Sequence, residues 1–309
     1  MKKLIGLLLL AFLIGLGWTF MPQKLAPVPE FAGQLPPASP PEGMSLSALP
    51  TGLMKSQAGF AYRGGSLLEQ RDFAMTPVLV RHPRGDLLFD AGFGSHVDSH
   101  VRTLPLLMQV TTQYEKSQPA ADQLRAGGYD PKQLTAVVLT HAHWDHVSGL
   151  DSLPGVPVMV STEERDFIQG GSEPVALAAS LRQIRYLTYG FSSGEYLGFP
   201  RSHDVWGDGS VVLVPAPGHT PGSVLAFITL PSGARHVLLG DLVWQREGID
   251  LPAERPWVSR WLLQEDRDQV RQAILQVAAL QRRFPELNLL PAHDARAMAM
   301  LPVFPEAAR

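Results

Sequence analysis

The sequence predicts an α+β protein with one folded domain, and three observations support this prediction. Residues 76–90 and 134–139 contain short runs rich in Val and Leu that are typical of strands. Residues 266–283 carry apolar side chains at helical spacing. The chain has 309 residues, of which 45% are hydrophobic and 18% are charged, and this composition is typical of a folded globular protein rather than a disordered one. A layered domain of this length can still be built around one core.

The chain begins with two lysines, Lys2 and Lys3, followed by an apolar run in residues 4–20. This order matches the charged and hydrophobic regions of a secretory signal, and the length is also within the lower range of a membrane span. Because a clear cleavage site is missing, residues 1–20 predict either a signal peptide or an N-terminal membrane anchor. Both interpretations predict export: the protein would be periplasmic, secreted, or anchored by residues 4–20, with membrane contact only through this segment.

Residues 21–45 are rich in proline, which favours an extended and semi-rigid linker. Such a segment would hold the domain away from a membrane or form the start of the mature chain. We therefore expect the folded domain in residues 46–309.

The charge and cysteine content exclude several kinds of partner and ligand. A net charge of −3 at pH 7 provides no basic excess for nucleic acid, so we expect a small-molecule substrate and no nucleic-acid partner. The chain has no cysteine, which excludes disulfides and thiolate metal ligands.

A dense group of metal-binding side chains follows the apolar run 134–139. His141, His143, Asp145 and His146 lie within six residues, and all are ligands suited to a divalent metal such as zinc. In an extended segment, residues two apart point the same way, so His141 and His143 can share one ion. After a turn, Asp145 and His146 can face a second ion. Two metals about 3.5–4 Å apart are a common hydrolytic arrangement, whereas scattered surface histidines do not explain this density.

The order of residues 141–146 resembles the His-x-His-x-Asp-His signature of the metallo-β-lactamase superfamily. Three later motifs, in residues 217–222, 239–241 and 290–294, are similar to the later metal motifs of that superfamily in order and in kind. The resemblance covers roughly residues 45–305. It implies a four-layer αβ/βα sandwich with a binuclear metal site at one edge.

The resemblance also implies two sets of metal ligands and one shared ligand: His141, His143 and His219 for the first ion, Asp145, His146 and His293 for the second, and Asp241 bridging both. A carboxylate can bridge because it has two donor oxygens. Asp90, in an Asp-x-Gly sequence, would orient ligand imidazoles from outside the ligand set. The alternative is an ordinary turn aspartate next to glycine.

Two bound divalent ions, with zinc as the expected metal, would lower the pKa of a bridging water so that hydroxide exists near neutral pH. Asp145 and Asp241 are the expected catalytic residues because either carboxylate can pass a proton to the leaving group. No side-chain nucleophile is needed for such a reaction, because the hydroxide itself attacks the substrate. The predicted function is therefore metal-dependent hydrolysis.

The expected substrate is a lactone or a related carboxylic ester, because the last motifs are similar to those of acyl-homoserine-lactone lactonases. The chain departs from those enzymes at Trp244, which occupies the position of their catalytic tyrosine. The alternatives are a glyoxalase II-like thioesterase, a β-lactamase, a sulfatase and an iron-loaded redox module on the same fold. The lack of cysteine together with Asp241 disfavours a β-lactamase, and no flavin-partner motif supports the redox module.

Residues 244–261 contain three tryptophans and three arginines, which suit an anionic or amphipathic substrate through stacking and ion pairing. Trp244, Arg255 and Arg260 are the candidate substrate contacts, and a surface loop anchored by tryptophans is the alternative. Residues 104–110 are rich in Leu and Met. They predict core packing, with an apolar flap over the site as the alternative.

Two further predictions concern residues near this segment. His96 and His100 are spaced like two ligands on one helical face, but with a ligand set elsewhere they are expected to be surface histidines. Residues 114–127 predict a helix that ends at two glycines.

Overall fold

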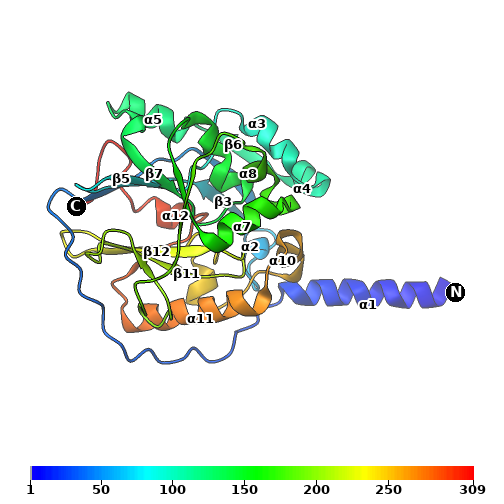
Figure 1. Cartoon of the computed structure of the whole chain (residues 1–309). Helices are drawn as coiled ribbons and strands as arrows, with labels where there is room; N and C mark the ends of the chain where they lie inside the picture. The colour runs from blue at the N-terminus through cyan, green and yellow to red at the C-terminus, as the bar shows by residue number, and fades with distance from the viewer. Residues whose placement is uncertain (1) are drawn as a thin grey trace.

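Two β-sheets pack face to face and helices cover their outer faces in the computed structural model, which describes residues 2–309 (Figure 1). The first sheet has the strand order β1-β4-β5-β7-β8-β9. Its strands are β1 (Ser45–Ala48), β4 (Val78–Arg81), β5 (Asp86–Phe89), β7 (Leu134–Val138), β8 (Val158–Ser161) and β9 (Tyr186–Tyr189). The strands predicted in residues 76–90 are confirmed, and they form the antiparallel pair β4–β5. From β5 to β9 the pairing is parallel.

The second sheet has the order β10-β11-β12-β13-β14. Its strands are β10 (His203–Asp204), β11 (Val211–Pro215), β12 (Val224–Thr229), β13 (Arg235–Leu238) and β14 (Asn288–Leu290). The pairs are antiparallel as far as β13, and β13 pairs with β14 in parallel.

Alternating side chains of the central strands define the layers. Ala136 and Val138 of β7 belong to a core that also contains residues of the second sheet such as Leu213, whereas Val137 packs toward the helices on the first sheet. In the second sheet Val212 packs against the helix layer on the other side. Successive side chains of a strand point to opposite faces. The result is the predicted four-layer αβ/βα sandwich.

The helices are short apart from the first and the eleventh: α1 (Lys2–Phe20), α2 (Ala58–Ala61), α3 (Val97–His100), α4 (Leu106–Thr111), α5 (Ala120–Ala126), α6 (Trp144–Val147), α7 (Thr162–Gly170), α8 (Ala176–Ser180), α9 (Glu247–Asp250), α10 (Trp257–Leu263), α11 (Arg267–Arg283) and α12 (Ala295–Met298). Helix α11 is the amphipathic helix predicted in residues 266–283, and it buries Val270, Ile274 and Val277 against the second sheet. Asp266 caps it by accepting hydrogen bonds from the amides of residues 268 and 269.

A small third sheet, with the order β3-β2-β6, stands beside the sandwich. It consists of β2 (Gly52–Gln57), β3 (Gln70–Met75) and β6 (Gln113–Lys116). The helix predicted over residues 114–127 is therefore wrong in its first part. Tyr114 pairs with Met54 of β2, and Pro119 is the N-cap of α5, since proline fits the start of a helix but not its interior.

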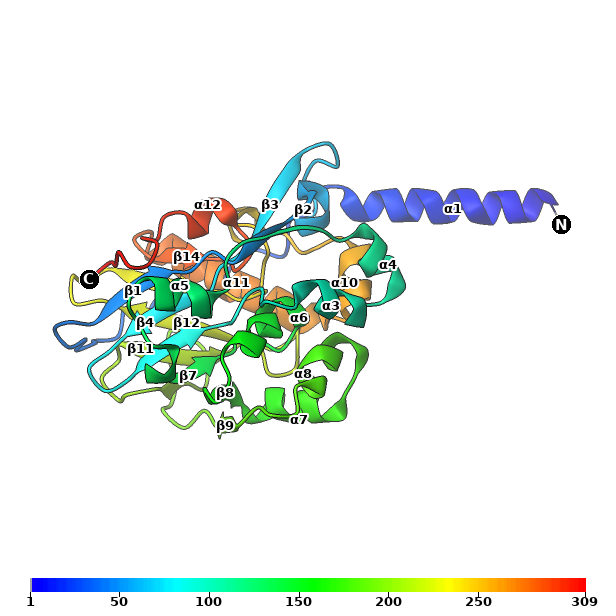
Figure 2. The same ribbon diagram turned by 90° about the horizontal axis from the view of Figure 1, so that it is seen from above.

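Helix α1 projects from one end of the domain and buries none of its residues (Figures 1 and 2). Among residues 2–309 it is the one helix that is long and apolar enough to span a membrane, with a mean hydropathy of 2.0. At 1.5 Å per residue, its 19 residues extend about 28 Å, close to the thickness of a bilayer hydrocarbon core.

The proline-rich segment is extended, as predicted, but it does not stand away from the domain. Leu25, Val28, Phe31 and Leu35 pack against the core between α11 and the second sheet. The ring of Phe31 contacts Phe284 at a centroid distance of 6.0 Å. The expectation that residues 21–45 hold the domain away from a membrane is therefore corrected, because apolar side chains three or four residues apart let this segment bury one side along the domain.

Candidate metal centre

The predicted metal ligands meet at one edge of the sandwich because four strands end there. β7 leads into His141, β11 into the loop with His219, β13 into Asp241 and β14 into His293. The chain turns into the short helix α6 directly after His143, and this turn points Asp145 and His146 to the other side of the centre. All seven predicted ligand side chains are buried at this edge.

Two groups of side chains each present ligand atoms within 4.8 Å of one another. His141, His143 and His219 form the first group, in which the Nε2 atoms of His141 and His219 are 3.2 Å apart. Asp145, His146 and His293 form the second. In the second group, the Nε2 atoms of His146 and His293 are 3.4 Å apart.

Asp241 lies between the two groups and turns one oxygen toward each. Its Oδ2 is 3.3 Å from His219 Nε2 and 3.9 Å from His141 Nε2. Its Oδ1 is 3.2 Å from His146 Nε2 and 3.1 Å from His293 Nε2. This is the arrangement required of a carboxylate that joins two metal positions.

The donor atoms fit two divalent metal ions. Buried imidazole nitrogens converge on each other rather than on hydrogen-bond partners, and the buried Nε2 of His143 has no polar partner. Burial lowers the pKa of His141 and of His143 well below the usual range, which keeps both rings in the neutral, metal-binding form. Imidazole and carboxylate together are typical zinc ligands.

Hydrogen bonds from the Nδ1 atoms fix the orientation of three ligand rings. His146 Nδ1 lies 2.8 Å from Asp90 Oδ2, His219 Nδ1 lies 2.7 Å from Glu265 Oε1, and His293 Nδ1 donates to the carbonyl of Ala74 at 2.9 Å. Each contact leaves Nε2 directed at the centre. Partners of this kind fix the tautomer and raise the basicity of a ligand imidazole.

Asp90 makes further contacts that agree with the expected supporting role. Its Oδ1 accepts a hydrogen bond from the amide of Thr140 at 2.7 Å, and its backbone has a positive φ of 56°. A non-glycine residue rarely adopts this conformation. The contacts hold the end of β7, and therefore His141, against the end of β5.

Glu164 and Glu265 are two supporting residues that the sequence analysis missed. Glu164 Oε1 accepts from the amide of Ala142 at 2.6 Å. Its Oε2 accepts from Thr220 Oγ1 at 2.6 Å and from the amide of Gly222 at 3.0 Å. One buried carboxylate on α7 thus joins the loops that carry the first group of histidines. Only the position of Glu164 at a helix start was visible in the sequence, since its partners are far away along the chain.

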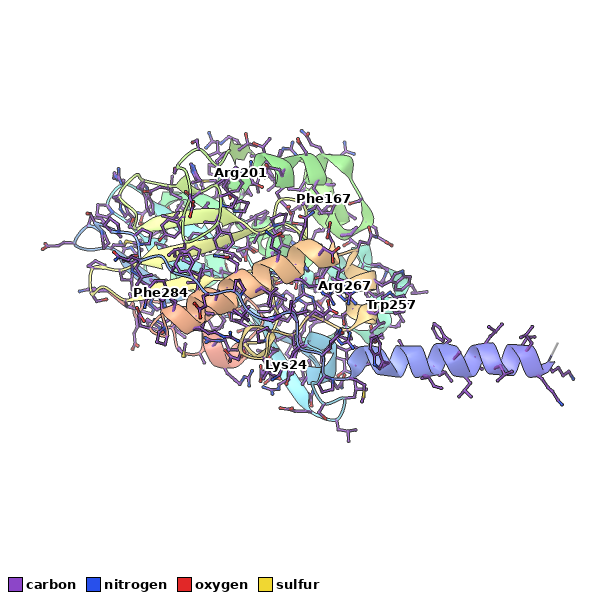
Figure 3. All side chains as sticks on the ribbon, turned by 90° about the horizontal axis from the view of Figure 1, so that it is seen from below. Lys24, Phe167, Arg201, Trp257, Arg267 and Phe284 are labelled. Carbon is purple, nitrogen blue, oxygen red and sulfur yellow. The ribbon has the colours of Figure 1, made fainter. Side chains whose placement is uncertain are left out.

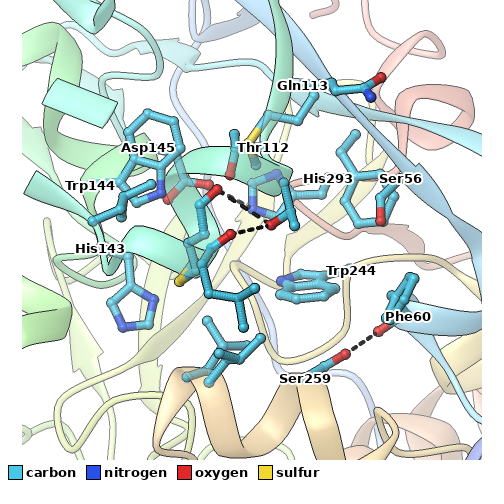
Figure 4. Close-up of a pocket in the computed structure, with 18 of the residues that line it drawn as sticks. Ser56, Phe60, Thr112, Gln113, His143, Trp144, Asp145, Trp244, Ser259 and His293 are labelled. Carbon is cyan, nitrogen blue, oxygen red and sulfur yellow. Dashed lines mark hydrogen bonds and ion pairs between the residues drawn. The ribbon is translucent and has the colours of Figure 1, made fainter. Parts of the chain in front are cut away.

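A pocket of about 510 Å³ opens directly above the two groups (Figure 4). His143, Asp145, Asp241 and His293 form part of its lining. The walls are mainly apolar and come from β2, α2, α4 with the turn before it, and α10: Met54, Phe60, Leu104, Leu107, Met108, Val258, Leu262 and Leu263. Its volume is within the range typical of small-molecule sites.

Helix α4 contradicts the prediction of core packing for residues 104–110. None of its residues is buried, and Leu107 and Met108 face the pocket. The alternative, an apolar flap over the site, describes this segment better. The Leu/Met pattern could not decide between the two, because both require apolar side chains.

The three candidate substrate contacts divide between the pocket and the structure behind it. Trp244 lines the pocket and donates from Nε1 to Asp241 Oδ2 at 2.7 Å. Arg255 is buried, pairs with Glu265 and donates to the Asp241 carbonyl at 2.8 Å. Arg260 donates to the carbonyl of Arg255 at 3.0 Å. Neither arginine is among the lining residues, so the structure places both behind the ligands rather than in contact with substrate.

The two histidines before α4 lie outside both ligand groups. His96 is exposed and its Nδ1 lies 2.8 Å from Asp151 Oδ2. His100 is buried, contrary to the expectation of a surface position, and its Nδ1 lies 2.8 Å from the Oγ of Ser148, the residue that follows α6.

Comparison with known proteins agrees with the fold and the site. A family model described as the metallo-beta-lactamase superfamily matches residues 75–303. A probable metallo-hydrolase of Mycobacterium tuberculosis is 30% identical over an alignment of 232 residues, and the match covers 70% of this chain and 73% of the relative. An N-acyl homoserine lactonase of Agrobacterium fabrum is 25% identical, and the match covers 54% of this chain and 64% of the lactonase.

Solved structures of lactonases share the fold. An N-acyl homoserine lactone hydrolase, with the product N-hexanoyl-L-homoserine at its catalytic metal centre, has a TM-score of 0.67 at 17% identity and covers 85% of this chain and 98% of its own. A dizinc quorum-quenching lactonase has a TM-score of 0.52 at 16% identity and covers 81% of this chain and 87% of its own.

The fold and the site define a metal-dependent hydrolase. The chain belongs to the metallo-beta-lactamase superfamily.

Proposed function

We propose that this protein is an exported two-metal hydrolase, with zinc as its metal, that cleaves a lactone or a related carboxylic ester. The observation that carries this proposal is the position of Asp241 between the two ligand groups, at the base of an apolar pocket. The lactonase relatives and fold neighbours support the same substrate class. Export is supported by α1, which follows two lysines and has the composition of a signal or anchor.

The chemistry divides between the ions and the side chains. When bound, two divalent ions supply Lewis acidity and lower the pKa of a water molecule toward neutrality. Asp145 and Asp241 both reach the pocket, where either carboxylate can hold a proton for the leaving oxygen. The apolar walls exclude water and hold the acyl part of the substrate.

Trp244 takes the position at which lactonases have a catalytic tyrosine. Its indole nitrogen can only donate, and it points to Asp241 from the pocket wall. We infer that this donor orients the Asp241 carboxylate.

The proposal is tested with the purified full chain and a panel of substrates: acyl-homoserine lactones with short and long chains, simple aryl esters, glutathione thioesters and a cephalosporin. Turnover of lactones or esters that is lost in His143→Ala and kept in the control His96→Ala supports the proposal. Hydrolysis of thioesters alone would replace lactones and esters by thioesters as the substrate class. A lack of hydrolysis in an iron-containing protein would contradict the hydrolase assignment of the site.

A further inference from the structure

Helix α4 forms one side of the pocket mouth and carries apolar side chains on its inner face, toward the pocket, and on its outer face. Leu107 and Met108 line the pocket, whereas Leu106 is 74% and Val110 is 71% exposed on the outside. A surface helix of a globular protein usually has a polar outer face. Both the inner and the outer faces of this helix are apolar.

Helix α10 forms the opposite side of the mouth and has the same property. Leu262 and Leu263 face the pocket. Trp257 and Trp261 face outward, and their rings stack at 5.9 Å, with Trp261 59% exposed. Figure 3 shows Trp257 projecting at the end of the domain beside the base of α1.

Both helices lie at the end of the domain from which α1 projects, as Figures 1 and 2 agree. The loop after α2 reaches the same place, because the amide of Gly64 donates to the carbonyl of Phe20 at 2.9 Å. Leu68 in this loop is 97% exposed. We name Leu68, Leu106, Val110, Trp257 and Trp261 the apolar rim.

The base of α1 is part of the folded domain. The buried guanidinium of Arg63 donates to the carbonyls of Trp18 at 3.0 Å and Met21 at 3.2 Å, and so satisfies carbonyls that the end of a helix leaves without partners. Phe20 packs edge to face on Phe60 at 5.6 Å, and Phe60 lines the pocket. Helix α1 and the pocket wall are therefore in direct contact.

We propose that α1 is retained as a membrane anchor and that the apolar rim docks on the lipid bilayer around it, so that the pocket opens at the membrane surface. The bilayer is the occupant because the rim lies at the end of the domain from which a helix with the composition of a membrane span projects. Tryptophans are enriched at membrane interfaces, and lysines favour the cytoplasmic side. Trp257 and Trp261 lie at one end of α1 and Lys2 and Lys3 at the other, which places the domain outside the cytoplasm. Membrane contact thus extends beyond residues 4–20.

This placement narrows the substrate class to lactones or esters that carry a membrane-soluble acyl chain, and this step rests on the proposed function. A substrate that dissolves in the bilayer through an acyl chain reaches the pocket between α4 and α10 without crossing water. Its polar lactone or ester group then meets the metal centre at the base of the pocket.

The docking is tested on the full chain in vesicles of phosphatidylethanolamine and phosphatidylglycerol. The chain has no cysteine, so single substitutions can carry a polarity-sensitive fluorophore. Labels at Val110→Cys and Trp261→Cys are expected to be quenched several-fold more by nitroxide lipids than a label at Arg282→Cys. Arg282 is exposed and lies next to Phe284, at the other end of the domain in Figure 3.

Equal quenching at all three positions overturns the docking. Burial of the two rim labels without quenching by lipid also overturns it, because a second copy of the chain would then cover the rim. Membrane-bound protein whose sequence starts beyond residue 20 overturns the retained anchor.

The consequence for substrates is tested with the double variant Leu106→Ser/Trp261→Ser, since neither side chain lines the pocket. Turnover of a short soluble substrate is expected to be unchanged, while kcat/KM for a long-chain substrate dissolved in vesicles falls about tenfold. An equal fall for both substrates contradicts a role in membrane delivery. If the unmodified chain hydrolyses nothing, the proposed function fails, whereas the quenching result is independent of activity.

Discussion

The metal centre and the apolar rim lie at the same end of the molecule but are built in opposite ways. The centre is polar and buried, and a second hydrogen bond fixes the rings of His146, His219 and His293. The rim is exposed and apolar, and its short helices α4 and α10 contribute few buried residues. Reactive groups need fixed geometry, while surfaces that admit a substrate are built from less constrained segments. Substitutions in the metal centre should therefore impair the reaction itself, whereas substitutions in the apolar rim should impair only the entry of substrate into the pocket.

The largest expected effect is loss of a first-group ligand. His143→Ala removes a buried imidazole whose Nε2 has no partner within the protein, and we expect hydrolysis to fall at least about a thousandfold because metal catalysis contributes several kcal/mol. Steady-state kinetics with defined metal content measure the loss. The rim variant Leu106→Ser serves as the control that keeps activity, and retention of more than a tenth of the activity in His143→Ala would contradict the ligand assignment.

Glu164 tests whether the supporting hydrogen bonds are as important as the ligands. Glu164→Ala leaves the amides of Ala142 and Gly222 without their acceptor, and outer partners of metal ligands contribute about 10–100-fold to metal affinity or activity. We expect a loss of that size in zinc affinity, measured by competition with a chelator. Glu163→Ala, at an adjacent and more exposed position, is the matched control; equal affinities in both variants would refute the role.

Trp244 connects the two regions because it lines the pocket and donates to Asp241. Trp244→Phe keeps an aromatic ring and removes the donor. A hydrogen bond to a charged group contributes about 1.5–3 kcal/mol, so we expect kcat/KM to fall at least about tenfold with little change in thermal stability. Unchanged kinetics in this variant would show that the donor has no part in the reaction.

A pH effect on stability is expected from Glu254, which pairs with Arg267 and Arg271 of α11. Burial alone would raise its pKa, but hydrogen bonds from these arginines outweigh it and lower the pKa of Glu254 to about 2. A carboxyl group with a lowered pKa stabilises the fold above its usual pKa, and this contribution disappears as the pH falls toward 2. Activity near neutral pH is not expected to depend on this titration.

The measurement is Tm as a function of pH for the full chain and for Glu254→Gln. The variant is expected to be less stable at pH 7, because the arginines lose their charged partner, and the difference should shrink between about pH 4.5 and 2. A difference that is constant across this range would contradict the lowered pKa.

The side chains that the structure brings together at the centre could be picked out from the sequence because their signals are local. Four ligands lie within residues 141–146, and each later motif follows a strand that ends at the same edge. The four-layer fold followed from the resemblance, and hydrophobic periodicity located its main strands and α11. Glu164 and Glu265 were missed because their roles depend on contacts with loops about 20 to 60 residues away.

The pocket was less predictable than the centre for a related reason. Arg255 and Arg260 looked like substrate contacts because they follow Asp241 along the chain, but pairing with Glu265 and Glu254 turns them away from the pocket. The segment of α4 has a pattern compatible with core or surface, and only its tertiary position shows that it is exposed. Composition also gave no sign that residues 25–35 pack on the domain.

The central claim is that two metal positions share Asp241, and the metal content of ligand variants tests it most directly. We expect about two zinc equivalents in the full chain, about one in His219→Ala and about one in His293→Ala, because each variant damages one group and leaves the other. Asp241→Asn should weaken both positions. One equivalent in the unmodified chain, or two in either histidine variant, would contradict the shared two-metal centre.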